Sequence, residues 1–180
     1  MRQSYLITLI LLTVFSNGLF GQTTEKVLTL NFINPGIDFE TPIGQKTTIA
    51  INAGIGYGTS YPELSTTGTG FLYLISPFVD LQTRKYYNLN KRNDLGKNTN
   101  MNSGNFYGLR FLSRSKEFKS NFERDNDIDF AIGPTWGLKR TYNRINLIFD
   151  IGPIIYWDKA STGFFPLTFE LNLGYILTKN

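Results

Sequence analysis

The 180-residue chain contains neither cysteine nor histidine. The absence of cysteine excludes a disulfide framework and a lipid-modified cysteine at a processed N-terminus. Without either residue type there is no thiol nucleophile, no Ser-His-Asp arrangement and no zinc site built from His and Cys. We therefore expect that the protein is not an enzyme and that it binds no cofactor or metal.

Charge is also scarce in this chain. Charged residues make up 18% of it, against about 25% in a typical soluble protein, whereas aromatic residues reach 15%. The formal net charge of +4 is small and spread along the sequence, so nothing indicates a nucleic-acid partner. A surface with few charges and many aromatic residues suggests that something other than water faces much of it.

The one long hydrophobic run lies at the N-terminus. Residues 1–21 combine Arg2, the apolar run "YLITLILLTVF" and the small, polar segment "SNGLFG" before Gln22. This three-part pattern is typical of a secretory signal peptide. The run is shorter than the ~20 residues of a membrane-spanning helix, which makes an N-terminal anchor the weaker alternative. We expect residues 1–21 to be removed and residues 22–180 to form one domain.

Beyond residue 21 no stretch has sustained helical periodicity, and apolar and polar residues alternate instead. Alternation with period two predicts β-strands. The first strand changes phase near Asn34, Pro35 and Gly36, where we expect a β-bulge. The predicted strands are 27–42, 46–58, 70–87, 104–116, 126–141, 144–158 and 164–178.

The predicted connections differ in length, as in barrels built from hairpins. "TPIGQK" and "RTYNRI" are tight, while "GTSYPELSTTGTG", "RSKEFKSNFERDND" and "DKASTGF" are longer and polar. The segment "NLNKRNDLGKNTNMNSGN" is long where a short turn is expected, and we interpret it as an ordered periplasmic connection. Its Lys91, Arg92 and Lys97 are either a solvated turn or a contact for anionic headgroups or a periplasmic partner.

The last strand shows both faces clearly. In "FFPLTFELNLGYILT" the odd positions from Phe165 to Leu177 are apolar or aromatic, whereas Glu170 and Asn172 lie on the even face. A soluble, lipocalin-like barrel turns its apolar face inward, and an outer-membrane barrel turns it towards lipid. The polar faces are rich in Gly, Ala, Asn and Thr, which suits a narrow, filled interior. Aromatic residues fall near strand ends, where membrane interfaces lie: Tyr57, Phe71, Tyr73, Trp136, Trp157, Phe165 and Tyr175.

Charged residues on the polar faces would then point into the lumen, where they must be paired. Asp38 and Glu40 are spaced as strand alternation alone requires, so we interpret them as structural rather than catalytic. A small barrel filled by ion pairs is expected to conduct no ions. The alternative is a set of unrelated, exposed charges on a soluble sheet. The predicted lumen charge network comprises Asp38, Glu40, Asp80, Arg84, Arg110, Asp129, Lys139, Asp150 and Glu170, with Arg114 beside them.

Several segments resemble the small outer-membrane β-barrel proteins common in Bacteroidetes. These are "NPGIDFETPIG", "SPFVDLQTRKYYNLNKRNDLGKNTNMNSGNFYGL", "AIGPTWGLKRTYNRINLIFDIGPIIY" and "LNLGYIL". The resemblance implies an antiparallel transmembrane β-barrel, and closure normally requires an even strand number, hence eight rather than the seven identified. It implies location in the outer membrane, with lipid as a partner, and implies no activity. We expect the protein to act structurally or through its extracellular loops, with a protein or glycan as the loop partner. The alternative is a secreted or periplasmic barrel that binds an apolar small molecule.

Overall fold

The computed structural model describes residues 24–60, 72–121, 124 and 126–178. The predicted signal peptide of residues 1–21, its cleavage before Gln22 and the aromatic residue Phe71 lie outside this part of the chain. Most of the connection "GTSYPELSTTGTG" lies outside it as well.

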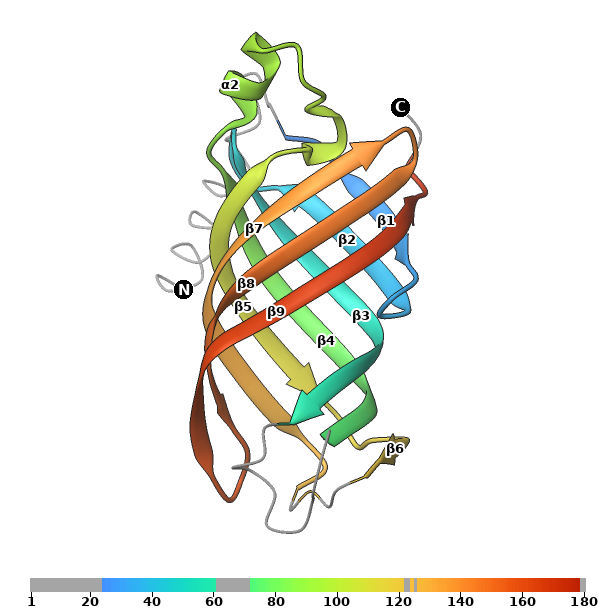
Figure 1. Cartoon of the computed structure of the whole chain (residues 1–180), viewed down its shortest axis with the longest axis vertical. Coiled ribbons are helices and arrows are strands. Elements are labelled where there is room, and N and C mark those ends of the chain that lie inside the picture. The colour runs from blue at the N-terminus through green and yellow to red at the C-terminus, as the bar shows by residue number, and fades with distance from the viewer. Residues whose placement is uncertain (1–23, 61–71, 122–123, 125, 179–180) are drawn as a thin grey trace, which may run out of the picture.

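The described chain folds into one antiparallel sheet that closes on itself as a ring (Figure 1). Each long strand pairs with its neighbours, β3 pairs with β4, and β9 returns to β1 through Thr29 opposite Ile176. The two-residue β6 extends the edge of β4 beyond the end of β5. The prediction of an antiparallel, all-β chain is confirmed. The strands are β1 Val27–Asn31, β2 Gly36–Pro42, β3 Thr47–Ser60, β4 Leu72–Tyr86, β5 Asn105–Arg114, β6 Lys119–Ser120, β7 Asp129–Tyr142, β8 Ile145–Trp157 and β9 Thr162–Ile176.

The ring contains eight long strands because the segment 27–42 is not one strand. It is a hairpin of β1 and β2, and the predicted bulge near Asn34 is wrong. Pro35 has no backbone N–H and therefore ends the ladder, while the Asn34 side chain accepts a hydrogen bond from the backbone N–H of Tyr57 at 3.1 Å. The phase change in the sequence marks a turn, and it accounts for the strand missing from the predicted count.

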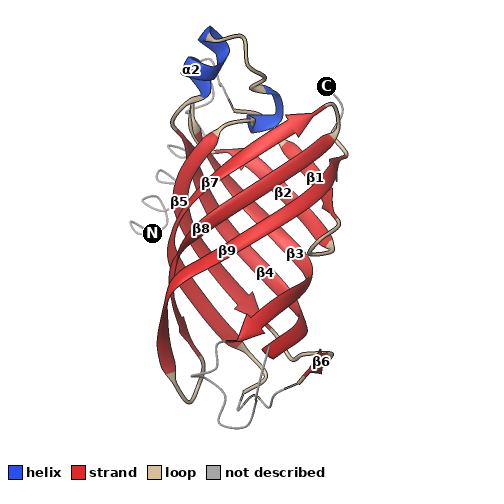
Figure 2. Cartoon of the chain, in the orientation of Figure 1, coloured by secondary structure: helices blue, strands red, loops and turns tan. Residues whose placement is uncertain are grey.

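The connection between β4 and β5, residues 87–104, is ordered and contains helical turns, which the loop-like composition of the segment does not predict. It contains the α-helix α2 (Leu89–Asp94) and the 3₁₀-helix η2 (Asn100–Asn102), which appear in blue in Figure 2. Met101 and Asn102 have positive φ angles of 53° and 63°. This conformation folds η2 back over the ring, so that Leu89, Met101 and Asn102 are buried.

The two ends of the ring differ in what they carry. The described chain begins and ends at one of them, which we call the termini end (Figure 1, top). The same end carries turns 43–46 and 143–144 and the β4–β5 connection. The other end, which we call the loop end, carries connections 32–35, 115–128 and 158–161. At the termini end the hydroxyl of Thr178 accepts a hydrogen bond from the Leu28 backbone at 2.7 Å.

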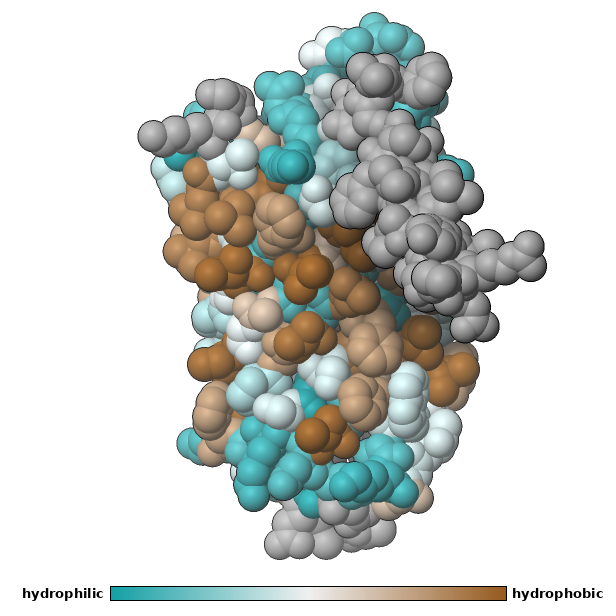
Figure 3. Space-filling model, turned by 180° about the vertical axis from the view of Figure 1, so that it is seen from behind, coloured by the Kyte–Doolittle hydropathy of each residue, from teal (hydrophilic) through white to brown (hydrophobic). Residues whose placement is uncertain are grey.

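Large apolar side chains face out of the ring, and polar ones face in. On β8 the even positions from Asn146 to Ile154 are buried and the odd positions are partly or fully exposed, as the alternation predicts. Apolar residues gather over the middle of the face in Figure 3, with hydrophilic residues towards both ends. Even Phe169, near the middle of β9, is 75% exposed. The arrangement is inverted relative to an ordinary soluble domain.

The lower part of β9 departs from the predicted alternation. Between Gly152 and Ile154 the register with β9 shifts by one residue, a β-bulge opposite Pro166 and Leu167. The bulge reverses the faces below it, so Phe164 is exposed, whereas Phe165 stacks on Tyr156 at 4.7 Å. The predicted outward position of Phe165 is therefore wrong. Pro153 and Pro166 both lack the N–H of a regular ladder, which explains why the irregularity lies here.

Apolar packing inside the ring is confined largely to the termini end. Tyr86, Leu89, Phe106 and Ile148 form one buried cluster, and Val27, Met101 and Ile176 form another. Both clusters include a residue of the β4–β5 connection, which therefore closes this end of the ring. Among the described residues no helix has the length and hydrophobicity needed to span a bilayer.

Close packing of inward-facing glycines leads to a first prediction. A methyl group on Gly137 would lie 2.4 Å from Cζ of Phe106 and 2.7 Å from the carbonyl oxygen of Phe149. Gly137→Ala should lower the free energy of unfolding by about 1–3 kcal/mol through overpacking. The measurement is a denaturant titration of the refolded chain, followed by tryptophan fluorescence.

Gly44→Ala is the matched control, because its methyl group would meet nothing closer than Cβ of Thr47 at 3.7 Å. This variant should be unchanged or slightly more stable, since alanine restricts the unfolded chain. Equal destabilisation by both substitutions would contradict the packing derived for Gly137.

Candidate functional site: a charge network inside the ring

Strand β4 contributes a continuous row of polar side chains to the interior of the ring. Its inward positions alternate as Asp80, Gln82, Arg84 and Tyr86, and all four side chains are buried. Four polar groups in line on one strand can contact both the neighbouring strands and the opposite wall of a narrow ring. This strand therefore connects the two hubs of the network, which are Glu40 and Arg110.

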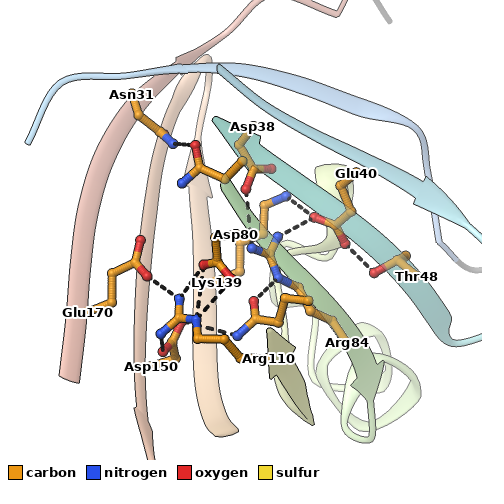
Figure 4. Close-up of polar contacts among 12 residues, drawn as sticks. Asn31, Asp38, Glu40, Thr48, Asp80, Arg84, Arg110, Lys139, Asp150 and Glu170 are labelled. Carbon is orange, nitrogen blue, oxygen red and sulfur yellow. Dashed lines mark hydrogen bonds and ion pairs between the residues drawn. The ribbon is translucent and has the colours of Figure 1, made fainter. Parts of the chain in front are cut away.

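Glu40 on β2 is the hub nearer the termini end (Figure 4). One carboxylate oxygen, Oε2, accepts from Nζ of Lys139 at 2.7 Å and from Nη1 of Arg84 at 3.0 Å. The other oxygen accepts from Thr48 at 2.7 Å, Tyr86 at 2.8 Å and the Asn102 amide at 3.0 Å. The Glu40 carboxylate is thus completely buried with both oxygens satisfied, which offsets the cost of removing its charge from water.

Arg84 joins this hub to the rest of the interior. Its Nη2 donates to Asp38 at 3.2 Å, and its Nε donates to the side-chain oxygen Oε1 of Gln82 at 2.6 Å. The Gln82 amide then donates to Thr135 at 3.1 Å and to Asp150 at 3.4 Å. Gln82 therefore makes one continuous polar network out of the two hubs.

Arg110 on β5 is the second hub, and carboxylates from three other strands converge on it (Figure 4). Its Nη2 lies 2.8 Å from Asp80 of β4, and its Nη1 lies 2.9 Å from Asp150 of β8. Glu170 of β9 also accepts from Nη2. One guanidinium thus fixes four strands in register. In the whole network five carboxyl groups face three basic side chains, so the acidic groups outnumber their basic partners.

Asp129 lies apart from both hubs, near the loop end. It accepts from Nε of Arg114 at 3.1 Å and from Nη2 of Arg124 at 2.8 Å. Arg124 also binds Glu117 at 2.7 Å. Burial alone would raise the pKa of the Glu117 carboxyl, but its own backbone N–H and Arg124 donate to it and hold the pKa below its ordinary value. This third group pins the 115–128 connection to the end of β5.

The structure brings eight of the nine predicted network residues together and places the ninth, Asp129, in the separate group with Arg114. Sequence reasoning missed Gln82, although it shares the parity of Asp80 and Arg84 and could have been found in that way. It also missed Tyr86, Thr48, Asn102, Arg124 and Glu117. The last three lie in connections, where alternation assigns no face.

The chemistry available to this site is hydrogen bonding and charge pairing. Within the described ranges no group of three or more acidic, His or Cys side chains is arranged to hold a metal ion. The three carboxylates around Arg110 are instead directed at a guanidinium. The geometry is that of a polar core which specifies the register of the ring.

Comparison with known proteins adds no family: no family model matches the chain, and neither a curated protein nor a solved structure matches it.

Loss of the second hub leads to a second prediction. Arg110→Gln leaves Asp80, Asp150 and Glu170 without their cation and should lower the free energy of unfolding by about 3–5 kcal/mol. Lys116→Gln is the matched control, because the Lys116–Asp127 pair is 3.5 Å long and largely exposed. Its loss should cost about 0–1 kcal/mol in the same denaturant titration.

A double-mutant cycle separates charge repulsion from simple loss of packing. Glu170→Gln alone should destabilise the protein, because it weakens a contact with Arg110. In the Arg110→Gln background the same substitution should stabilise it, since one of three repelling carboxylates is removed. Additive losses would show that Arg110 does not compensate these carboxylates.

Proposed function

We propose that the protein is a small outer-membrane β-barrel with a filled, non-conducting lumen. It has no catalytic role and acts as a structural element or through contacts of its loops. The observation that carries this proposal is the inverted distribution of side chains around a closed ring. Among the described residues, large hydrophobic side chains are exposed at 29 positions, while buried polar or charged residues outnumber buried hydrophobic ones by 20 to 11.

An apolar surface of this extent needs a solvent other than water. Closing the ring gives every long strand a hydrogen-bonded neighbour on both sides, and a sheet without free edges is the form in which strands can span hydrocarbon. Aromatic residues lie on the outward face towards both ends of the ring. Tyr107 and Trp136 are among those towards the termini end, and Phe130 and Trp157 are among those at the loop end. This pattern supports two membrane interfaces with hydrocarbon between them.

The alternative, a soluble barrel that binds an apolar small molecule inside, has less support. Such a barrel requires an apolar interior and a charged exterior. Here the described interior is crossed by the network of Glu40, Gln82 and Arg110, and the two buried apolar clusters lie at the termini end, against the β4–β5 connection. In the proposed topology the termini end faces the periplasm and the loop end faces the outside, as in single-chain outer-membrane barrels.

The third prediction tests lipid contact along β9. The chain has no cysteine, so single cysteines placed in this strand report without background. With a fluorophore attached and the protein reconstituted in bilayers, a lipid-soluble quencher should act strongly at 167, 169, 171 and 173. It should act weakly at 168, 170 and 172, whose side chains face the lumen.

The bulge sharpens this test, because it reverses the faces below Leu167. Phe164→Cys should be quenched more than Phe165→Cys, which continued alternation would not produce. Uniform quenching along the strand, or none at the odd positions above the bulge, would show that the apolar face does not meet lipid.

The fourth prediction concerns conduction. The charge network fills the middle of the lumen, and Asn102 of the β4–β5 connection donates to Glu40 from the termini end. The full chain should therefore give no stable open channels in planar-bilayer recordings. Large, long-lived conductance steps from pure protein would contradict a filled lumen.

A further inference from the structure

The two ends of the ring carry very different charge. In the described part of the chain the termini end has two carboxylates, Glu25 and Asp94, and eight cations. At the loop end, the described cations in connections 115–128 and 158–161 nearly balance the carboxylates there. The termini-end cations are Lys26, Lys46, Lys85, Lys91, Arg92, Lys97, Arg140 and Arg144.

These eight cations also share the property that they form no ion pair with a described carboxylate. The ten ion pairs among the described residues involve Arg84, Arg110, Arg114, Lys116, Arg124 and Lys139. None of the termini-end cations pairs with a carboxylate of the described chain. Arg140 instead donates to the side chain of Asn105 at 2.6 Å and to the Gly104 carbonyl at 3.0 Å. These neutral contacts orient its guanidinium and leave its positive charge uncompensated.

The cations lie among aromatic rings on the outward face. Lys85 lies 6.0 Å from the ring centre of Tyr107, and Arg144 lies 5.8 Å from that of Tyr175. Tyr87 stacks on Tyr107, and its hydroxyl accepts from Trp136 at 3.0 Å. Rings with an apolar body and a polar tip, beside long cationic side chains, suit the boundary between hydrocarbon and headgroups.

The β4–β5 connection brings further charge to the same place. Arg92 donates to the Asn98 carbonyl at 2.8 Å, and the Asn98 side chain donates to the Thr141 carbonyl at 2.7 Å. These two hydrogen bonds hold Arg92 against the end of β7, close to Arg140. Two arginines held near each other without a carboxylate form a place where an anion such as phosphate can bind.

We propose that this rim binds the phosphate groups of anionic phospholipids in the surrounding leaflet. The inference rests on the proposed function, because it requires the ring to span a bilayer. A phospholipid fits better than an acidic protein, since Lys85, Arg140 and Arg144 are on strands or a turn beside outward-facing rings, at the level where lipid headgroups surround the ring. Lysine and arginine clusters next to a bilayer attract anionic lipid in this way.

The two tryptophans allow the inference to be tested within one protein, because Trp136 lies towards the termini end and Trp157 at the loop end. In Trp157→Phe only Trp136 fluoresces, and in Trp136→Phe only Trp157 does. Each variant is reconstituted in phosphatidylcholine vesicles that contain an equal fraction of brominated phosphatidylcholine or brominated phosphatidylglycerol. Trp136 should be quenched with a relative affinity for phosphatidylglycerol of about threefold or more, and high salt should reduce this preference.

The matched variants assign the preference to particular side chains. Lys85→Gln with Arg140→Gln should abolish it at Trp136, whereas Arg140→Lys, which keeps the charge, should retain most of it. Lys116→Gln with Lys119→Gln removes two cations from the loop end and should leave the Trp136 preference unchanged. Trp157 should show no preference in any variant. Because both leaflets have the same composition, the orientation of the protein in the vesicles does not affect the result.

The outcomes separate this inference from the proposed function. Equal quenching of Trp136 by both lipids would overturn the phospholipid rim and leave the barrel proposal intact, with an acidic protein as the remaining partner for the cations. A preference that survives loss of Lys85 and Arg140 would overturn the assignment to this rim. If neither brominated lipid quenches either tryptophan, the membrane proposal itself fails.

Discussion

The fold depends on burying charge in a ring too narrow to hydrate it. Once apolar side chains occupy the outer face, the inner positions must pair among themselves, because an isolated charge in a low-dielectric interior is very costly. Glu40 on β2 and Arg110 on β5 satisfy this condition from opposite sides of β4, with partners on β3, β4, β7, β8 and β9. A strand displaced by one residue would turn its charged face outward and break both hubs, so the network specifies register as well as contributing contacts.

The same constraint explains the small residues between the charges. Long side chains such as Arg84, Lys139 and Tyr86 extend across the interior, so the inward-facing residues next to them must have small side chains or none. Gly137 lies against the ring of Phe106, and Gly108 approaches the carbonyl of Thr83. Glycine in strands usually reduces stability, but here it allows large polar groups to pack inside a small circumference.

Alternation in the sequence was sufficient to predict the strands from β3 onwards and to identify which face each network residue occupies, but it did not separate β1 from β2. Alternation could not predict which of these residues pair with one another. An odd or even position assigns a side chain to a face of its strand but does not say at which level along the axis of the ring the side chain lies. The register between strands decides which inward residues lie at the same level, and register depends on turns such as the one at Pro35, which the alternation marks only as a change of phase. Asn102 lay beyond this reasoning altogether, since its place under Glu40 follows from positive φ angles within a connection. Phe165 was misplaced because a bulge beside two prolines reversed the pattern below it.

Closure of the ring has a consequence for how the chain assembles. Most neighbouring strands are joined by short hairpins, but β1 and β9 are separated by nearly the whole described sequence and share only three paired positions, centred on Leu30 and Tyr175. This pairing carries the largest loop-closure entropy and gains fewer contacts than any other pairing among the eight long strands, so it is the natural last step of folding. Until it forms, the sheet has two free edges, and the unpaired backbone N–H and C=O groups on both edges can pair with strands of other chains. The interval before β1 meets β9 is therefore when this protein is most exposed to aggregation.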